Sequence, residues 1–168
     1  MQTSKSDVFR EMLEEVDLGE KESRKVVIQD AGAESVKLFV KFLYTAQLSD
    51  EDMYANYGEL ITLAHFYQVK WLLVTLDDFV SKHVVMKDTA IEVLKTAYSY
   101  ELEMTKEAAL NLVVADKELF EMAYKELQRD HPWMAFELSK FIFSRFMALN
   151  DRQNTSQPIL DRCVFFNR

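Results

Sequence analysis

Apolar side chains recur every three or four residues along most of this 168-residue chain, which is the period of one helix face. The first such segment covers residues 6–15, with Ser6 placed as its N-cap. A charged loop follows, and the β-prone run Val26-Val27-Ile28 after it predicts a short strand. A turn over residues 30–33 precedes the next helix. The apolar face of that helix comprises Val36, Phe39, Val40 and Leu43.

Capping signals mark the start of further helices. Ser49 precedes three acids, which is the pattern of an N-cap with negative charge in the first helical turn. We expect this helical region to break near residues 68–70 and to resume at Trp71. The apolar stripes on either side of the break are Leu60, Leu63, Ala64 and Tyr67, and then Leu72, Leu73, Leu76, Phe79 and Val80.

Thr89 and Glu92 have the spacing of a capping box, which predicts another helix from Ala90. Its apolar face comprises Ala90, Val93, Leu94, Ala97 and Tyr98. A second helix from about Thr105 carries Ala108, Ala109, Leu112 and Val113. His131-Pro132 then breaks the chain before a last helix over residues 133–149.

That last helix is apolar on nearly every side, so it is either packed within the chain or docked on another chain. Both alternatives stay open. Residues 150–168 have the composition of a loop, and we expect a disordered tail.

Composition agrees with a mainly helical protein, because the chain has only three Gly and two Pro. The single Cys163 and the absence of a signal pattern in the first residues favour the reducing interior of a cell, in the nucleus or cytoplasm. A formal charge of −8 argues against nucleic-acid binding. No apolar run reaches the roughly twenty residues that a membrane span needs.

Catalytic and metal-binding patterns are weak. His65, His83 and His131 lie far apart, and none has a second His or a Cys at the spacing of metal ligands. Asp77 and Asp78 are neighbours that point apart on a helix, so a solvated face is favoured over an acid/base pair. We therefore predict no enzyme, no cofactor and no bound metal.

Three segments carry a resemblance to a known family. Ser6-Asp7-Val8-Phe9-Arg10-Glu11-Met12-Leu13, the short strand ending in Asp30, and a helix closing in Phe42-Leu43-Tyr44-Thr45 together resemble the BTB/POZ domain of adaptor proteins. Residues 89–114 resemble the 3-box helical pair of such adaptors. His131-Pro132 with Glu137 resembles the end of the MATH-BTB, speckle-type relatives.

The resemblance implies an α+β BTB/POZ fold that is mainly helical here. It implies a partial BTB/POZ domain over residues 1–84, a 3-box or BACK-like helical extension over residues 85–149, and the tail over residues 150–168. Ala46 replaces the Gly that usually follows Tyr-Thr, so we expect a remodelled turn there.

The family normally has a dimerisation helix, a two-stranded hairpin and another helix before the position of Ser6, whereas only five residues precede Ser6 here. We consider three explanations for this difference from the family. In order of preference, they are a truncated gene model, a degenerate paralogue, and a chain whose missing strands are supplied by a partner.

The resemblance also implies a function. Leu18-Gly19-Glu20 matches the hydrophobic-x-Glu element with which BTB adaptors bind cullin-3, and Tyr67 is a further candidate contact. The expected function is a non-enzymatic substrate adaptor of a cullin-3 ubiquitin ligase. The alternative is a scaffold that forms homo- or hetero-oligomers with other BTB chains and binds no cullin.

Overall fold

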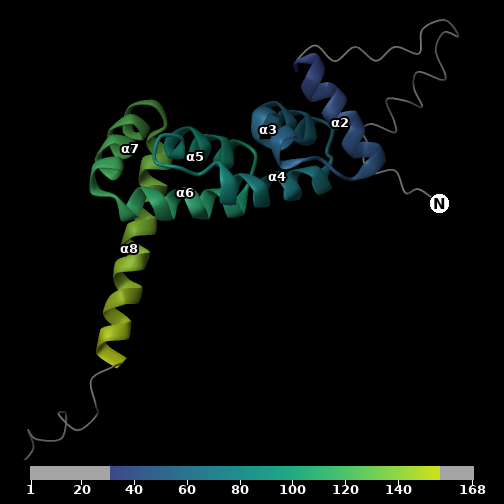
Figure 1. Ribbon diagram of the computed structural model, residues 1–168. Coiled ribbons are helices and arrows are strands. Elements are labelled where there is room, and N and C mark those ends of the chain that lie inside the picture. Colours follow the sequence, from purple (N-terminus) through teal and green to yellow (C-terminus); the bar gives the residue numbers. More distant parts are fainter. Residues whose placement is uncertain (1–30, 156–168) are drawn as a thin grey trace, which may run out of the picture. The chain divides into compact units, whose positions relative to one another are not determined.

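The computed structural model describes residues 31–155, and all regular structure in this range is helical (Figure 1). This confirms the mainly α fold class. The helices are α2 (Ala33–Thr45), α3 (Asp50–Phe66), α4 (Lys70–His83), α5 (Ala90–Ser99), α6 (Glu103–Ala115), α7 (Lys117–Asp130) and α8 (Pro132–Thr155). The predicted helix over residues 6–15 and the predicted strand Val26-Val27-Ile28 lie outside the described residues.

The chain divides into two compact units after Leu112. The predicted domain boundary after residue 84 falls inside the first unit and stays a prediction. The predicted tail differs from the structure in one respect, because α8 continues past Leu149 to Thr155. Loop-like composition is therefore no guide at this point, since a helix that is already formed extends at little cost through polar residues.

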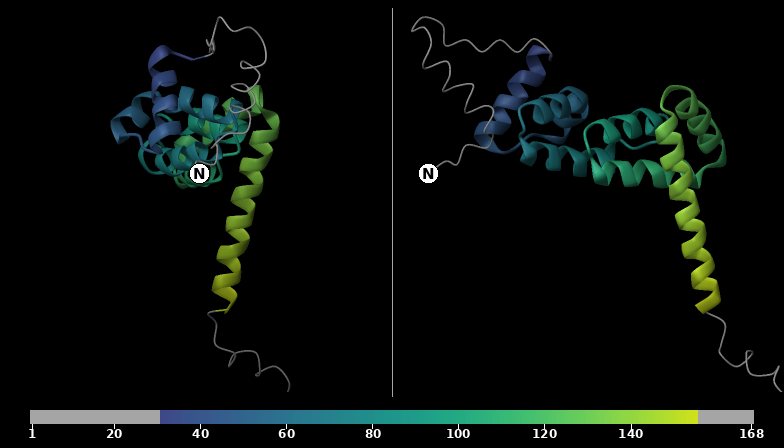
Figure 2. Two further views of the ribbon diagram at one scale, coloured as in Figure 1. Left: turned by 90° about the vertical axis from the view of Figure 1, so that its right-hand side faces the viewer. Right: turned by 180° about the vertical axis from the view of Figure 1, so that it is seen from behind.

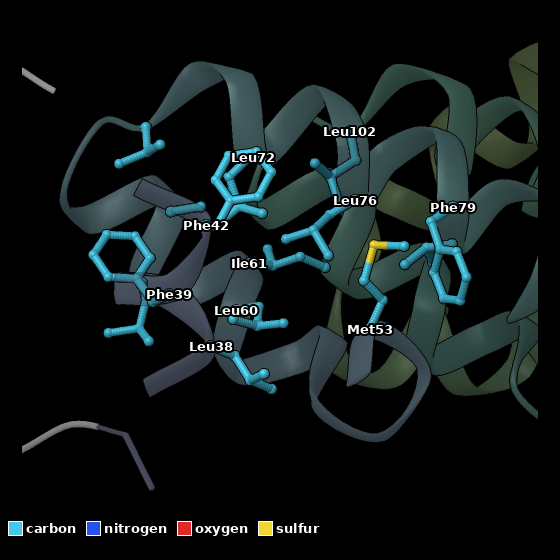
Figure 3. Close-up of a cluster of buried hydrophobic side chains, with 14 of the residues drawn as sticks. Leu38, Phe39, Phe42, Met53, Leu60, Ile61, Leu72, Leu76, Phe79 and Leu102 are labelled. Atoms are coloured by element: carbon cyan, nitrogen blue, oxygen red, sulfur yellow. The ribbon is translucent and has the colours of Figure 1, made fainter. Parts of the chain in front are cut away.

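The core of the first unit is built on α3, which contacts both α2 and α4 (Figures 1 and 2). Side chains from α2 to α5 and from the turns between them form one buried apolar cluster (Figure 3). The predicted stripe of α3 is confirmed, since Leu60, Leu63, Ala64 and Tyr67 are all buried. The predicted break between α3 and α4 is confirmed as well.

The predicted apolar face of α2 is partly wrong. Phe39 is buried, but the residues beside it in the core are Leu38 and Phe42, whereas Val36 and Leu43 are only partly buried at the edge. Residues 36 to 43 contain six apolar side chains, so two overlapping stripes have helical spacing. Periodicity cannot choose between them, and packing against α3 selects the one with the larger side chains.

Polar contacts join the exposed sides of α2 and α3. The Gly32 N–H, just before α2, donates to Glu59 Oε2 at 2.7 Å. Lys41 on α2 pairs with Asp52 on α3 at 3.1 Å. The Lys41 ammonium, together with the Ser49 hydroxyl, lowers the pKa of Asp52 below its ordinary value. The predicted N-cap is confirmed, because Ser49 Oγ accepts a hydrogen bond from the Asp52 N–H at 3.1 Å.

The predicted capping box at Thr89 is wrong in its chemistry, although α5 does begin at Ala90. The Thr89 side chain caps no N–H of α5. Its hydroxyl instead donates to the Val84 carbonyl at 2.5 Å and accepts from the Met86 N–H at 3.0 Å. The hydroxyl closes the turn before the helix because that turn brings these two backbone groups closer than the first turn of α5.

One side chain of α4 holds the start of α6. Asp77 Oδ1 accepts from the Thr105 N–H at 2.8 Å, and Asp77 Oδ2 accepts from the Met104 N–H at 3.1 Å. The Thr105 hydroxyl also donates to the Asp77 carbonyl, and Thr105 is fully buried. Asp77 thus acts as an N-cap supplied from a different helix, and satisfies two N–H groups that α6 cannot bond itself. Its neighbour Asp78 pairs with Lys82 along α4, so the two acids do point apart.

The second unit contains α7 and α8, which contact each other. Asp116 alone separates α6 from α7, and its carboxylate accepts from the Glu118 and Leu119 N–H groups, each at 3.1 Å. The predicted break at His131-Pro132 is confirmed, with Pro132 as the first residue of α8. The buried side chains of this pair of helices are Leu119, Ala123, Leu127, Met134, Ala135 and Leu138.

Ala46 ends α2 in the left-handed conformation, with φ 57° and ψ 24°, and its N–H bonds to the Phe42 carbonyl at 2.8 Å. The expected remodelling of this turn does not occur, because the chain keeps the backbone conformation that glycine favours. Alanine adopts this conformation only with steric strain between its Cβ and the carbonyl oxygen.

We therefore predict that Ala46→Gly raises the free energy of unfolding by about 1 kcal/mol. The matched control is Ala55→Gly at an exposed position within α3, which should lower it by about 1 kcal/mol. Urea unfolding followed by circular dichroism measures both. Equal destabilisation by the two variants would contradict the strained turn.

The Asp77 cap gives a second prediction. Asp77→Ala should lower the free energy of unfolding by about 1 to 2 kcal/mol, because it removes the acceptor for two N–H groups of α6. Asp78→Ala is the matched control, and removing its exposed ion pair should cost less than about 1 kcal/mol. The same urea titration tests both, and similar losses from the two variants would rule out the proposed cap.

Candidate protein-binding site

A surface hollow of about 440 Å³ lies in the first unit, between the turn that joins α3 to α4 and the turn that joins α5 to α6. The hollow is formed by side chains from both turns and from the exposed side of α4. They are His65, Gln68, Lys70, Leu73, Val74, Asp77, Tyr100, Glu101 and Leu102.

Both turns have the same backbone geometry. Gln68 and Glu101 follow the ends of α3 and α5 in the left-handed conformation, with φ 52° and 57°. The next N–H in each case reaches back five residues, from Val69 to the Ala64 carbonyl at 2.8 Å and from Leu102 to the Ala97 carbonyl at 2.9 Å. This is the Schellman motif, which usually has Gly at the left-handed position. It sends the next side chain into the core and leaves the left-handed residue at the surface.

The floor of the hollow is held by contacts around Tyr100. Its hydroxyl lies 3.0 Å from Thr62 Oγ1, and its ring packs edge to face with the His65 ring, with the centroids 5.2 Å apart.

The charged groups around the hollow are already engaged or scattered. Since Asp77 caps α6, its carboxylate is occupied by two backbone N–H groups. Apolar walls with charged groups at the rim suit a segment of another protein. Within residues 31–155 no three His, Cys, Asp or Glu side chains gather into a metal site.

Exposed apolar side chains continue this surface along α4. Trp71 is 62% exposed and Val74, which also lines the hollow, is 60% exposed. They lie three residues apart and so on one face of the helix. Neither was predicted to be exposed, although the sequence contains a signal for it. Four consecutive apolar residues from Trp71 to Val74 cannot all face the core of a helix, so some must point outward.

The predicted cullin contacts stay predictions. Leu18 and Glu20 lie outside the described residues. Tyr67 is described, and it is buried at 6% exposure, with its ring 5.5 Å from that of Phe39 and 5.0 Å from that of Phe66. Its role in the core is therefore plain, while its role as a partner contact stays a prediction.

A second apolar surface lies in the other unit, on α8. We call it the α8 stripe, and it consists of Trp133, Phe136, Phe143, Phe146 and Met147, each 47% to 65% exposed. It faces away from the buried residues Met134 and Leu138. Lys140 lies over the Phe136 ring at 5.6 Å and pairs with Glu137 at 2.8 Å. The side of α8 that carries Met134 and Leu138 is therefore buried, as expected for an apolar helix. The side that carries the α8 stripe is exposed in this chain, so docking of that side on another chain stays a prediction.

Comparison with known proteins finds a family match within the first unit. Residues 3–84 match the family model of the BTB/POZ domain. This part of the chain is therefore similar to a BTB/POZ domain, a class of fold that mediates contacts between proteins.

The chain is also similar to BTB and MATH domain-containing protein 40 of Caenorhabditis elegans, with 23% identity over 157 residues. The match covers 92% of this chain but only 37% of that protein. These findings support a protein-interaction module. No helix in the described part of the chain combines the length and apolar character needed to cross a bilayer.

Proposed function

We propose that this chain is a non-enzymatic substrate adaptor that binds the cullin-3 scaffold of a ubiquitin ligase. The observation that carries the proposal is the BTB/POZ match over residues 3–84, because it includes Leu18-Gly19-Glu20 in the loop after the first predicted helix. A relative named for BTB and MATH domains supports the same class.

Leu18 is the central residue of this proposal. It stands among charged residues in a predicted loop, where an apolar side chain gains little from its own chain and much from a pocket on a partner. Glu20 adds a charged contact beside it. The exposed surface at Trp71 and Val74, with the adjoining hollow, offers a second apolar area that a large partner can cover.

We predict that the double variant Leu18→Ala, Glu20→Ala loses co-purification with cullin-3 by at least tenfold, since an interface anchor contributes about 2 kcal/mol or more. The matched control is Lys21→Ala, Glu22→Ala in the same loop, which leaves the anchor in place. Circular dichroism confirms that each variant is folded. Unchanged co-purification of the first variant would sink this mechanism.

The α8 stripe favours a second function, that of a scaffold which assembles with other BTB chains. Five large apolar side chains at about half exposure or more exceed what a monomer usually leaves in water on one helix. Pairing of two such stripes buries them. A scaffold of this kind needs no cullin.

We predict that Phe136→Glu, Phe143→Glu reduces self-association, because each substitution leaves a charge where an apolar contact would form. Met122→Glu, on the 62% exposed Met122 of α7, is the control and should have no effect. Size-exclusion chromatography with light scattering, with and without cullin-3, measures the mass. A stable oligomer that ignores cullin-3 favours the scaffold, and a wild-type monomer at all concentrations excludes it.

A further inference from the structure

A second hollow of the first unit lies where α3 begins and α4 ends, and shares no residue with the surfaces described above. Its volume is about 410 Å³. Five side chains line it, two acidic and three aromatic: Asp50, Glu51, Tyr54, Phe79 and His83. We call it the acidic aromatic hollow.

The aromatic side of the hollow is anchored in the hydrophobic core through Phe79. Phe79 is 6% exposed and belongs to the buried cluster, where Figure 3 shows it at the same end as Met53. The exposed His83 ring stacks on Phe79, with the ring centroids 4.8 Å apart and the planes at 28°. Tyr54 is 53% exposed, so its ring offers a face to solvent beside the acids.

The carboxylates of the hollow lie at the positive end of the α3 dipole, and the side-chain contacts at this helix start are made by other residues. The third acid at this helix start, Asp52, is engaged by Lys41, and the Ser49 side chain supplies the N-cap. Within the described part of the chain, neither Asp50 nor Glu51 has an ion pair or hydrogen bond to its carboxylate. The positive end of the α3 dipole amounts to about half a charge, so two carboxylates leave the hollow negative.

We infer that the acidic aromatic hollow binds an arginine side chain of a partner protein. The charge complementarity is direct, since a guanidinium group is a cation with five N–H donors and two carboxylates line the hollow. Its flat face also stacks on aromatic rings, which a lysine ammonium does less well. Arginine therefore matches both halves of the hollow, the acids at its rim and the rings in its wall.

The test is a titration of the full-length chain, labelled with ¹⁵N, with N-acetyl-arginine amide at low salt. We expect saturable shifts of the backbone amide signals of residues 50–54 and of His83. N-acetyl-citrulline amide has nearly the same shape without the charge, and it should cause no saturable shift at these residues. Scattered shifts, or equal binding of the citrulline compound, would overturn the inference.

Two variants locate the binding. Asp50→Asn, Glu51→Gln should weaken binding of N-acetyl-arginine amide about fivefold or more, whereas Glu118→Gln, Glu121→Gln on α7 removes two exposed charges elsewhere and should leave it unchanged. Tyr54→Ala should weaken binding, and Tyr44→Ala, at a tyrosine that is 80% exposed outside the hollow, should not. The ¹⁵N spectrum of each variant reports its folding. Equal losses in the two double variants would mean that general charge attraction, not the hollow, holds the ligand.

Discussion

The carboxylate of Asp77 is the contact on which the arrangement of the first unit depends. It lies on α4, yet both of its oxygens accept N–H groups from the start of α6, and the fully buried Thr105 bonds back to the Asp77 carbonyl. A helix start without its own capping side chain is costly when it is buried. Supplying the cap from α4 removes that cost only when α6 begins at this place, so one side chain sets the position of the helix.

The two Schellman turns act together with this cap. Each places a left-handed residue, Gln68 or Glu101, at the surface and the following residue, Val69 or Leu102, in the core. Since Asp77 holds α6 directly after Leu102, the second turn cannot move away from α4. The hollow between the turns is therefore a consequence of where α3 and α5 end and where α4 and α6 begin. Its walls are preorganised, which lowers the entropy lost when a partner binds.

The sequence is sufficient for the parts of this fold that depend on periodicity and local caps. Spacing or capping chemistry predicts the stripe on α3, the break before α4, the Ser49 cap and the break at Pro132. The cap by Asp77 is not predictable in this way, because its partners are twenty-seven and twenty-eight residues away and no local pattern encodes them. Neither Schellman turn is predictable from local chemistry, since both use a residue other than Gly. The exposure of Trp71 and Val74 escapes prediction for a different reason, because an apolar stripe indicates only the buried side of its helix.

The aromatic residues of the first unit fall into a buried group and an exposed group, and substitutions in the two groups affect different properties of the protein. Tyr67 and Phe39 contact each other within the core, so substitution of either affects stability before it affects any partner. Trp71 and Tyr54 are more than half exposed and sit beside a hollow, where burial by a partner is the remaining way to remove their apolar surface from water. A family of interaction domains can keep its core unchanged and vary such exposed residues. Substitution of Trp71 or Tyr54 therefore changes a surface that a partner can cover, whereas substitution of a core aromatic residue changes stability first.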